Sequence, residues 1–160
     1  MDKYQFLHTG SYVKIILHNI PEKPGVFAKM TNILADRQIN ILTIRHLVLS
    51  ADTGEIAFTV SKDQADEAFQ LMEHHKKEIG ASDVTIKKDL ALVFILGEGI
   101  KNLSAFVSDV MRAFSEYNVD FDSLTTTQEG MTCILPEHQF NQAMHAFNKM
   151  FVDEPIISPI

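Results

Sequence analysis

Hydrophobic residues along the chain follow first the spacing of a strand and then the spacing of a helix. Val13 to His18 is a dense β-branched run, which predicts a strand. After a proline-rich loop, apolar residues recur three and four positions apart, as on one face of a helix. These residues are Val26, Phe27, Met30, Ile33 and Leu34. Two more strands are predicted next, over Ile39 to Leu49 and over Ile56 to Val60.

A second helix is predicted after these strands. Ser61 and Gln64 have the spacing of a capping box, which favours a helix start at this point. An apolar stripe follows, and Gly80 stands where the C-terminus of a helix belongs. Val84 and Ile86 then predict a short strand. The element order is therefore β-α-β-β-α-β.

The same order of elements begins again in the second half of the chain. The predicted elements are a strand over Leu90 to Leu96, a helix over Leu103 to Tyr117, strands over Val119 to Thr127 and Met131 to Leu135, and a helix over Phe140 to Met150. A shift of 80 residues places Met30 on Val110, and after the hairpin a shift of 75 places Ala68 on Ala143. Two helices and three strands in matching order predict an internal duplication.

The second copy has no strand of its own at the end. Two prolines make the segment after Phe151 a poor strand. Tyr4, Phe6 and His8 alternate like a strand that has no partner in the first copy. We therefore expect a first repeat over 13–88, a second repeat over 89–152 that a strand from 1–12 completes, and a tail over 153–160.

The charge of the chain argues against two classes of partner. The formal net charge is −7 and the isoelectric point about 5.4. An acidic surface repels nucleic-acid phosphates and anionic lipids, so neither nucleic acid nor a membrane is an expected partner. The longest apolar run, Leu90 to Gly97, is too short to span a bilayer, and no apolar secretion signal opens the chain. A cytoplasmic location is the default expectation.

The first loop and its surroundings resemble a known family. A strand, the loop Pro21-Glu22-Lys23-Pro24-Gly25, an amphipathic helix and then Ile39-Asn40-Ile41 together resemble an ACT domain. Two copies in tandem, the second opened by Gly97 to Asn102, are similar to the regulatory region of aspartate kinase, a non-catalytic subunit. The resemblance implies an α+β fold of two ferredoxin-like βαββαβ ACT repeats, with antiparallel sheets and helices on one face.

The first loop is the leading candidate for binding a small molecule. A helix N-terminus has unpaired N–H groups and attracts anions, which suits the carboxylate of an amino acid. Asn40 or Glu22 offers an acceptor for the ammonium group, and Gly25 lets a ligand approach the backbone. The candidate binding residues are Glu22, Lys23, Pro24, Gly25, Val26, Phe27, Asn40 and Ile41. For the loop alone, a simple tight turn is the alternative interpretation.

A second candidate site lies at the corresponding loop of the second repeat. Its residues are Gly99, Ile100, Lys101, Asn102 and Asp120. Ser104-Ala105 stands where the first repeat has Pro24-Gly25, and Asp120 stands where an Asn is common in the family. Both departures favour the first site over the second.

Metal binding and catalysis find little support in the sequence. Zinc sites need three or four converging ligands, whereas His74 and His75 point to different faces of a helix. Cys133 lies among apolar residues of a strand, which is typical of a buried structural cysteine. We expect no cofactor, no metal and no enzymatic activity.

The expected function is therefore that of a non-catalytic regulatory protein. It would sense a free amino acid at its ACT loops and transmit binding through the geometry of a homodimer. One alternative is a ligand-free interaction subunit that holds a catalytic partner, such as aspartate kinase in amino-acid biosynthesis. Another is a small enzyme, because this scaffold hosts many functions.

Overall fold

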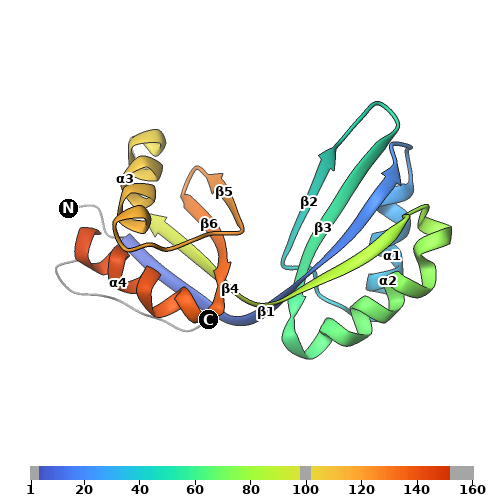
Figure 1. Cartoon of the computed structure of the whole chain (residues 1–160), viewed down its shortest axis with the longest axis horizontal. Coiled ribbons are helices and arrows are strands. Elements are labelled where there is room, and N and C mark those ends of the chain that lie inside the picture. The colour runs from blue at the N-terminus through green and yellow to red at the C-terminus, as the bar shows by residue number, and fades with distance from the viewer. Residues whose placement is uncertain (1–3, 98–101, 152–160) are drawn as a thin grey trace. The chain divides into compact units, whose positions relative to one another are not determined.

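The computed structural model describes residues 4–97 and 102–151 and divides the chain into two compact units (Figure 1). Repeat A consists of Tyr12–Lys88, and repeat B combines Met1–Ser11 with Asp89–Ile160. Two long strands contribute to both repeats, β1 (Tyr4–Pro21) and β4 (Asp83–Gly97). Repeat A is thus a continuous segment, whereas repeat B is assembled from two separate ones.

Repeat A contains four strands and two α-helices. Besides parts of β1 and β4 it has α1 (Val26–Ala35), β2 (Thr43–Val48), β3 (Thr53–Ser61), the 3-10 turn η1 (Lys62–Gln64) and α2 (Ala65–Ile79). The strands are hydrogen-bonded in the order β2-β3-β1-β4, and β3 is antiparallel to both β1 and β2. One face of the sheet packs against the two helices and forms the core of repeat A. Its fully buried residues include Ile15, Leu17 and Phe58 on the strands and Met30, Leu34 and Met72 on the helices.

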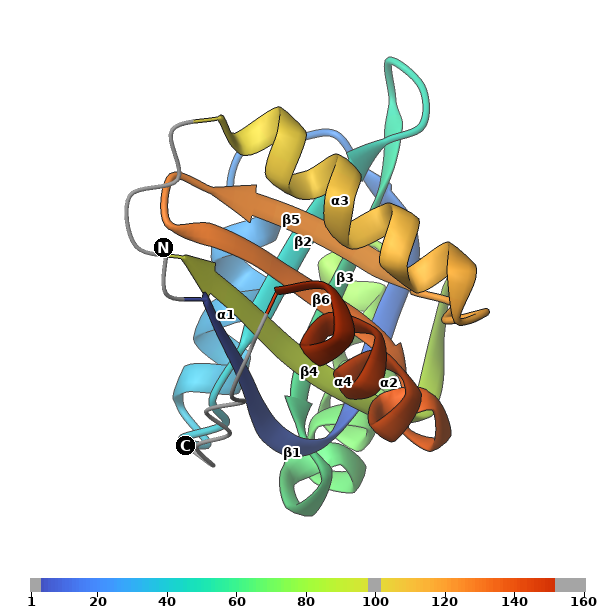
Figure 2. The same cartoon turned by 90° about the vertical axis from the view of Figure 1, so that its left-hand side faces the viewer.

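Repeat B has the same plan with a different source for one strand. Its own elements are α3 (Leu103–Glu116), β5 (Ser123–Thr127), β6 (Gly130–Pro136), the turn η2 (Glu137–Gln139) and α4 (Phe140–Phe151). Its strands are ordered β1-β4-β6-β5, so β1 supplies an edge strand of this repeat (Figure 2). Phe6 of β1 is buried in the core of repeat B, where its ring lies 5.2 Å from that of Phe147.

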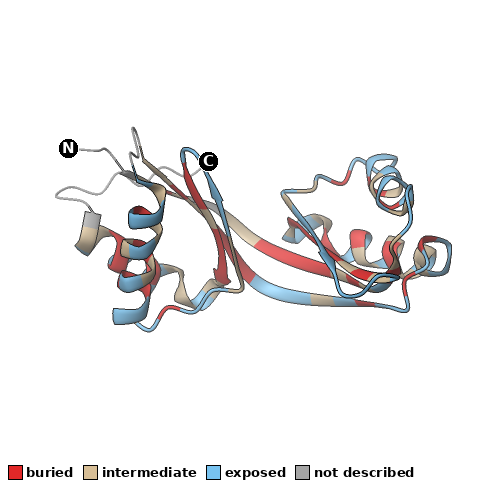
Figure 3. Ribbon diagram, turned by 90° about the horizontal axis from the view of Figure 1, so that it is seen from above, coloured by how far each residue is buried: buried red, intermediate tan, exposed pale blue. Residues whose placement is uncertain are grey.

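The predicted fold class is confirmed: the chain is α+β, with antiparallel strands and ferredoxin-like repeats. Figure 3 shows that the buried residues of each repeat lie on its strands and on the helix sides that face them. In two places the sequence predicted two separate strands where the structure has one. Strand β1 includes both Tyr4–His8 and Val13–His18, and strand β4 includes both Val84–Ile86 and Leu90–Leu96. Local periodicity detected the pieces, but their continuity depends on strand neighbours that lie far away in sequence.

Two predicted strands begin later than expected. The strand expected from Ile39 starts at Thr43, and the one expected from Val119 starts at Ser123. Each is preceded by a residue with positive φ, Gln38 (56°) or Asn118 (51°). These residues end α1 and α3 in a left-handed conformation, which allows Ile39 N to donate to Leu34 O at 3.0 Å. The apolar residues that follow therefore pack as helix-terminating loops.

The predicted capping box at Ser61 and Gln64 is wrong. Ser61 makes no capping bond, and α2 starts only at Ala65. The Gln64 side chain instead crosses to the end of α1, where Nε2 donates to Gln38 O (3.1 Å) and Oε1 accepts from Asn40 N (3.0 Å). The helix end predicted at Gly80 is confirmed, because Gly80 has φ 90° and caps α2.

Gln139 of repeat B occupies the position that corresponds to Gln64. Its Oε1 accepts from Asp120 N at 2.8 Å, as Gln64 accepts from Asn40 N. The two contacts are related by the offsets of 75 and 80 residues seen in the sequence. Both repeats therefore fasten the connection after their first helix with the same glutamine.

Candidate ligand-binding site

A cavity of about 350 Å³ opens beside the loop that follows β1 in repeat A. It is bounded by the end of β1, the first turn of α1 and the hairpin of β2 and β3. Its apolar lining residues are Ile20, Pro21, Val26, Phe27 and Ile56, and its polar ones are Glu22, Lys23 and His46. A volume of this size lies at the small end of the range for ligand cavities in proteins.

The loop at the cavity is held by backbone contacts. Glu22 N donates to Asp52 O of the β2–β3 turn at 3.0 Å, and Lys23 N donates to Pro21 O at 2.8 Å. Gly25 then starts α1 with φ 90° and ψ −17°, a left-handed conformation that side chains resist. This backbone angle explains the glycine, because a Cβ at Gly25 would meet no atom within 4 Å. The expected close approach of a ligand is not needed to account for it.

Two polar side chains of the cavity are paired with each other. The Nε2 of His46 lies 2.7 Å from the Oε1 of Glu22, and the ring of His46 meets that of Phe27 edge-on at 6.2 Å. An ionised carboxylate only accepts hydrogen bonds, so the imidazole donates through Nε2–H. A Cβ on Gly54 would overlap the Oε1 of Glu22 and come within 3.0 Å of the His46 Nε2. The absence of a side chain at Gly54 therefore makes room for this pair.

The structure brings together four of the eight residues predicted for the first site. Glu22, Lys23, Val26 and Phe27 line the cavity. Pro24 and Gly25 belong to the same loop but are not among the lining residues.

Asn40 and Ile41 lie elsewhere, after α1. The backbone N of Asn40 is bound by Gln64, and Ile41 packs against the core of repeat A. Of the two predicted acceptors for an ammonium group, Glu22 lines the cavity and Asn40 does not.

Sequence reasoning missed four lining residues: Ile20, Pro21, His46 and Ile56. The sequence predicted Ile20 and Pro21 in the loop after the first strand, and Ile56 in a half-buried strand. His46 is distinguishable only by register, since its pairing with Ile56 places it on the helix side of the sheet. A polar residue at an inward position of a predicted strand was the available signal.

The second candidate site lies only partly within the described residues. Gly99, Ile100 and Lys101 fall outside them. Asn102 is the N-cap of α3, and its Oδ1 accepts from Ala105 N at 3.0 Å. The backbone N of Asp120 is bound by Gln139. The described residues of this group therefore make structural contacts.

Repeat B has a smaller cavity at a different place. Its volume is about 200 Å³, and it lies between α3 and α4. The lining residues are Ala113, Glu116, Tyr117, Ala146, Lys149 and Met150. This position is remote from the start of α3, so it does not correspond to the cavity of repeat A.

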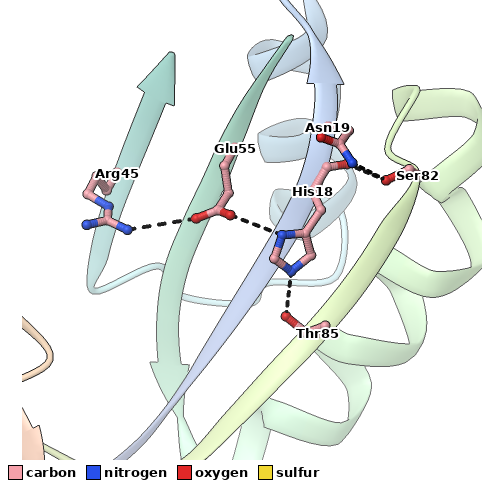
Figure 4. Close-up of polar contacts among 6 residues, drawn as sticks. All are labelled: His18, Asn19, Arg45, Glu55, Ser82 and Thr85. Carbon is pink, nitrogen blue, oxygen red and sulfur yellow. Dashed lines mark hydrogen bonds and ion pairs between the residues drawn. The ribbon is translucent and has the colours of Figure 1, made fainter. Parts of the chain in front are cut away.

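A second polar cluster crosses the opposite face of the repeat A sheet (Figure 4). Glu55 lies 3.8 Å from Arg45 on one side and 3.0 Å from His18 Nδ1 on the other, and His18 Nε2 lies 2.7 Å from Thr85 Oγ1. A carboxylate, an imidazole and a hydroxyl in line are also the parts of a nucleophilic triad. The cavity, however, lies on the other face, and these contacts connect β2, β3, β1 and β4.

Lys14 lies on the same face as this cluster and is buried. Burial lowers the pKa of its ammonium to about 8, and the nearby charges of Arg45 and Lys87 lower the pKa further in the same direction. Glu55 partly offsets these effects. Around Lys14, basic side chains therefore outnumber acidic ones.

The described residues offer no group of three or more side chains that could hold a metal ion. Cys133 is buried in β6, and burial raises the pKa of its thiol to about 12. The thiol therefore stays protonated near neutral pH, where a nucleophilic cysteine must ionise. In residues 4–97 and 102–151, no helix has the length and hydropathy needed to cross a membrane.

Residues 15–80, which include the whole cavity lining, match the family model of the ACT domain. The chain contains an ACT domain. The regulatory subunit of aspartate kinase from Thermus thermophilus, in its ligand-free form, is 27% identical, with a TM-score of 0.81 over 91% of this chain and 96% of that one. The corresponding subunit from Thermus flavus is 26% identical, with a TM-score of 0.78 over 94% and 96%.

Similarity to longer proteins agrees with these structures. An aspartokinase from Thermus thermophilus is 29% identical over 142 residues, which cover 88% of this chain and 35% of the relative. The chain thus spans about a third of the length of the curated relatives that it matches. The predicted resemblance of the tandem ACT chain to the regulatory region of aspartate kinase is confirmed. Similarity to two regulatory subunits over nearly their full length supports a regulatory role.

Proposed function

We propose that the chain is a non-catalytic regulatory protein that binds a free amino acid in the cavity of its first ACT repeat. The observation that carries the proposal is the cavity itself, which lies at the Pro-Gly loop where the sequence predicted a ligand. An ACT domain over residues 15–80 and similarity to regulatory subunits agree with this role.

The cavity offers complementary groups for both charges of an amino acid. The first turn of α1 has backbone N–H groups whose helical acceptors are missing, and a helix N-terminus favours a carboxylate. Glu22 provides a carboxylate for the ammonium group, and Lys23 adds a positive charge. A zwitterion therefore fits the site better than a simple anion.

Binding would be transmitted through the contact between two copies of the chain. In repeat A, β2 is an edge strand whose Ile44, Leu47 and Val48 are 39%, 43% and 61% exposed. Exposed apolar residues on a free strand edge favour pairing with another strand. His46 belongs to the same strand and lines the cavity, so a ligand there would act on the geometry of a β2-to-β2 homodimer.

The exposed edge also supports a second candidate function. A catalytic partner, such as an aspartate kinase subunit, would cover the same residues, and the chain would then be an interaction subunit with no ligand. The two candidates differ in whether the protein responds to free amino acids. Both keep the chain non-catalytic.

A thermal-shift screen against all proteinogenic amino acids decides between the two functions. At a ligand concentration of about 100 Kd, binding stabilises the folded protein by about 2.7 kcal/mol, which is a clear rise in melting temperature. Glu22→Gln should lower this stabilisation to about 0.4–1.4 kcal/mol, as expected for binding that is ten- to a hundredfold weaker. Glu67→Gln, which changes an exposed carboxylate on α2, serves as the control. If no amino acid shifts the melting temperature at millimolar concentration, the interaction subunit is the better account.

Sedimentation equilibrium tests the dimer. Leu47→Lys introduces a charge at the β2 edge and should convert dimer to monomer, whereas Thr126→Lys on the exposed edge strand β5 should leave the association unchanged. A wild-type protein that remains monomeric at high concentration would exclude homodimer geometry as the means of transmission.

A further inference from the structure

The lining of the repeat A cavity is mostly apolar and contains one acidic and one basic side chain. Ile20 and Ile56 are buried core residues, and Phe27 is 38% exposed at the start of α1. The charged lining residues are Glu22 and Lys23. A ligand inside the cavity therefore meets one negative charge, one positive charge and a hydrocarbon surface.

Glu22 is positioned by its neighbours and keeps one oxygen available. His46 Nε2 holds Oε1 at 2.7 Å, and the backbone N of Glu22 is tied to Asp52 O. Within residues 4–97 and 102–151, Oε2 of Glu22 accepts no hydrogen bond. The pairing restricts the carboxylate to one orientation, which lowers the entropy lost when a cation binds to Oε2.

Lys23 is held only through its backbone. Lys23 N donates to Pro21 O at 2.8 Å, and its side chain is exposed. In the described part of the chain, the side-chain ammonium makes no hydrogen bond or ion pair. An exposed ammonium of this kind contributes a modest attraction to a carboxylate.

We infer that the effector is an amino acid with one ammonium, one carboxylate and an apolar side chain, such as leucine, isoleucine, valine or methionine. The inference rests on the proposed function and specifies its ligand class. The ammonium binds Oε2 of Glu22, the carboxylate lies toward Lys23 and the start of α1, and the side chain packs against Ile20, Phe27 and Ile56. His46 and Gly54 position Glu22.

The charge count of the cavity disfavours amino acids with charged side chains. Once Glu22 binds the α-ammonium, no second lining carboxylate remains for the side chain of lysine or arginine. A side chain of aspartate or glutamate would face Glu22 and hydrocarbon. Burying an unpaired charge against an apolar surface is costly, so these ligands bind much more weakly.

Calorimetric titration of the full chain with trimmed ligands tests each contact separately. The probes are L-leucine, 4-methylpentanoate (which lacks the ammonium), 3-methylbutylamine (which lacks the carboxylate), L-lysine and L-aspartate. L-Leucine should bind most tightly. Removal of the ammonium should weaken binding by roughly tenfold to a hundredfold, as expected for a hydrogen bond between charged groups.

Two variants assign the charges to residues. Glu22→Gln should weaken L-leucine by roughly ten- to a hundredfold but leave 4-methylpentanoate unchanged, because that ligand has no ammonium to lose. Lys23→Met should weaken L-leucine by about two- to fivefold and leave 3-methylbutylamine unchanged. Glu67→Gln and Lys62→Met remove the same charges outside the cavity and serve as matched controls.

Gly54→Ala tests the positioning of Glu22 without changing any charge. The new methyl group would displace the Glu22–His46 pair and would also lie 2.8 Å from the backbone O of Leu47 in β2. If the hairpin accommodates this contact, the variant should weaken L-leucine binding and leave 4-methylpentanoate binding the same. Circular dichroism melting of this variant shows whether the hairpin remains folded. Equal loss for both ligands would mean that the cavity itself has collapsed, and Glu22→Gln then carries the decision.

The outcomes separate this inference from the proposed function. If lysine or aspartate binds more tightly than leucine, and Glu22→Gln abolishes that binding, the amino-acid sensor stands and the apolar ligand class is wrong. If leucine binds but neither Glu22→Gln nor Lys23→Met affects it, the assignment to this cavity is wrong. If no amino acid binds at all, both the inference and the proposed function fail.

Discussion

Repeats A and B share a backbone plan but differ in what they offer to a ligand or a partner. In both, two helices cover a four-stranded sheet, and a glutamine fastens the connection after the first helix. In repeat A that helix starts at a left-handed glycine beside a cavity of about 350 Å³. In repeat B it starts at Asn102, whose side chain caps the first turn.

The surfaces of the two repeats differ just as clearly. Repeat A has ten of the fourteen Lys and Arg residues and ten of the twenty-one Asp and Glu residues, so its formal charge is zero. Repeat B has the other four basic residues and the other eleven acidic residues, so it accounts for the whole net charge of −7. The edge strand β2 has Ile44, Leu47 and Val48, whereas β5 ends in three threonines. Duplication has kept the core contacts and changed the exposed chemistry.

The largest expected effect is on the core of one repeat alone. Phe6→Ala should destabilise repeat B by about 3–5 kcal/mol, because a fully packed aromatic ring is lost. Leu17→Ala is the matched change in repeat A. Hydrogen exchange should show lost protection in β5, β6 and α3 for the first variant and in α1 and α2 for the second. Equal loss across both repeats in both variants would show that they unfold as one unit.

Alkaline pH should affect the two repeats in opposite directions. Lys14 has a folded-state pKa of about 8, below its unfolded value, so repeat A gains stability as pH rises from about 8 to 10.5. Cys133 has a folded-state pKa of about 12, above its unfolded value, so repeat B loses stability as pH rises from about 9 toward 12. Each effect is at most about 3–4 kcal/mol.

Urea denaturation across this pH range measures the two contributions. The free energy of unfolding of each variant is subtracted from that of the wild type at each pH. Lys14→Met should lack the gain in stability, and Cys133→Ala should lack the loss. Other lysines and tyrosines cancel in the subtraction. A Lys14→Met curve parallel to the wild type would mean that the Lys14 pKa is not lowered in the folded protein.

The two helix starts should respond differently to alanine. Gly25→Ala should cost about 1–2 kcal/mol, because a side chain resists positive φ. Asn102→Ala should cost about 1 kcal/mol through the lost cap. Chemical denaturation measures both, with Ser104→Ala as a control inside α3. Gly25→Ala with unchanged stability would show that α1 can start with another backbone geometry.

The smallest effect tests what the repeats have in common. Gln64→Ala and Gln139→Ala should each cost about 1 kcal/mol, because each variant frees a backbone amide. Hydrogen exchange at Asn40 N and Asp120 N should rise in the respective variant. Gln70→Ala, on an exposed position of α2, is the control. If only one of the two variants loses stability, the glutamine contact stabilises that repeat alone.

Periodicity was sufficient to predict most of the elements. The stripes beginning at Val26 and Leu103 became α1 and α3, because their apolar residues lie on one helical face that packs on a sheet. The resemblance between the halves followed from the same periodicity. These properties depend on neighbours within one or two turns, which a sequence displays directly.

Contacts between distant segments were beyond sequence reasoning. Gln64 has the spacing of a capping residue, yet its side chain reaches a loop 24 residues earlier in the chain. His46 faces the cavity only because β2 pairs with β3 in one register. Asn40 was favoured as a ligand acceptor from its neighbours in sequence, but the end of α1 turns at Gln38 and leaves it outside the cavity lining.

Repeat A is inserted into repeat B, and this nesting bears on the order in which the chain folds during synthesis. All of Tyr12–Lys88 has been made before most of repeat B exists, so repeat A has every residue of its core at that stage. Phe6 emerges earlier still, yet its partner Phe147 is added 141 residues later. At a synthesis rate of roughly 5–20 residues per second, this wait lasts about 7–28 seconds. During it Phe6 lacks the core of repeat B that buries it in the folded protein.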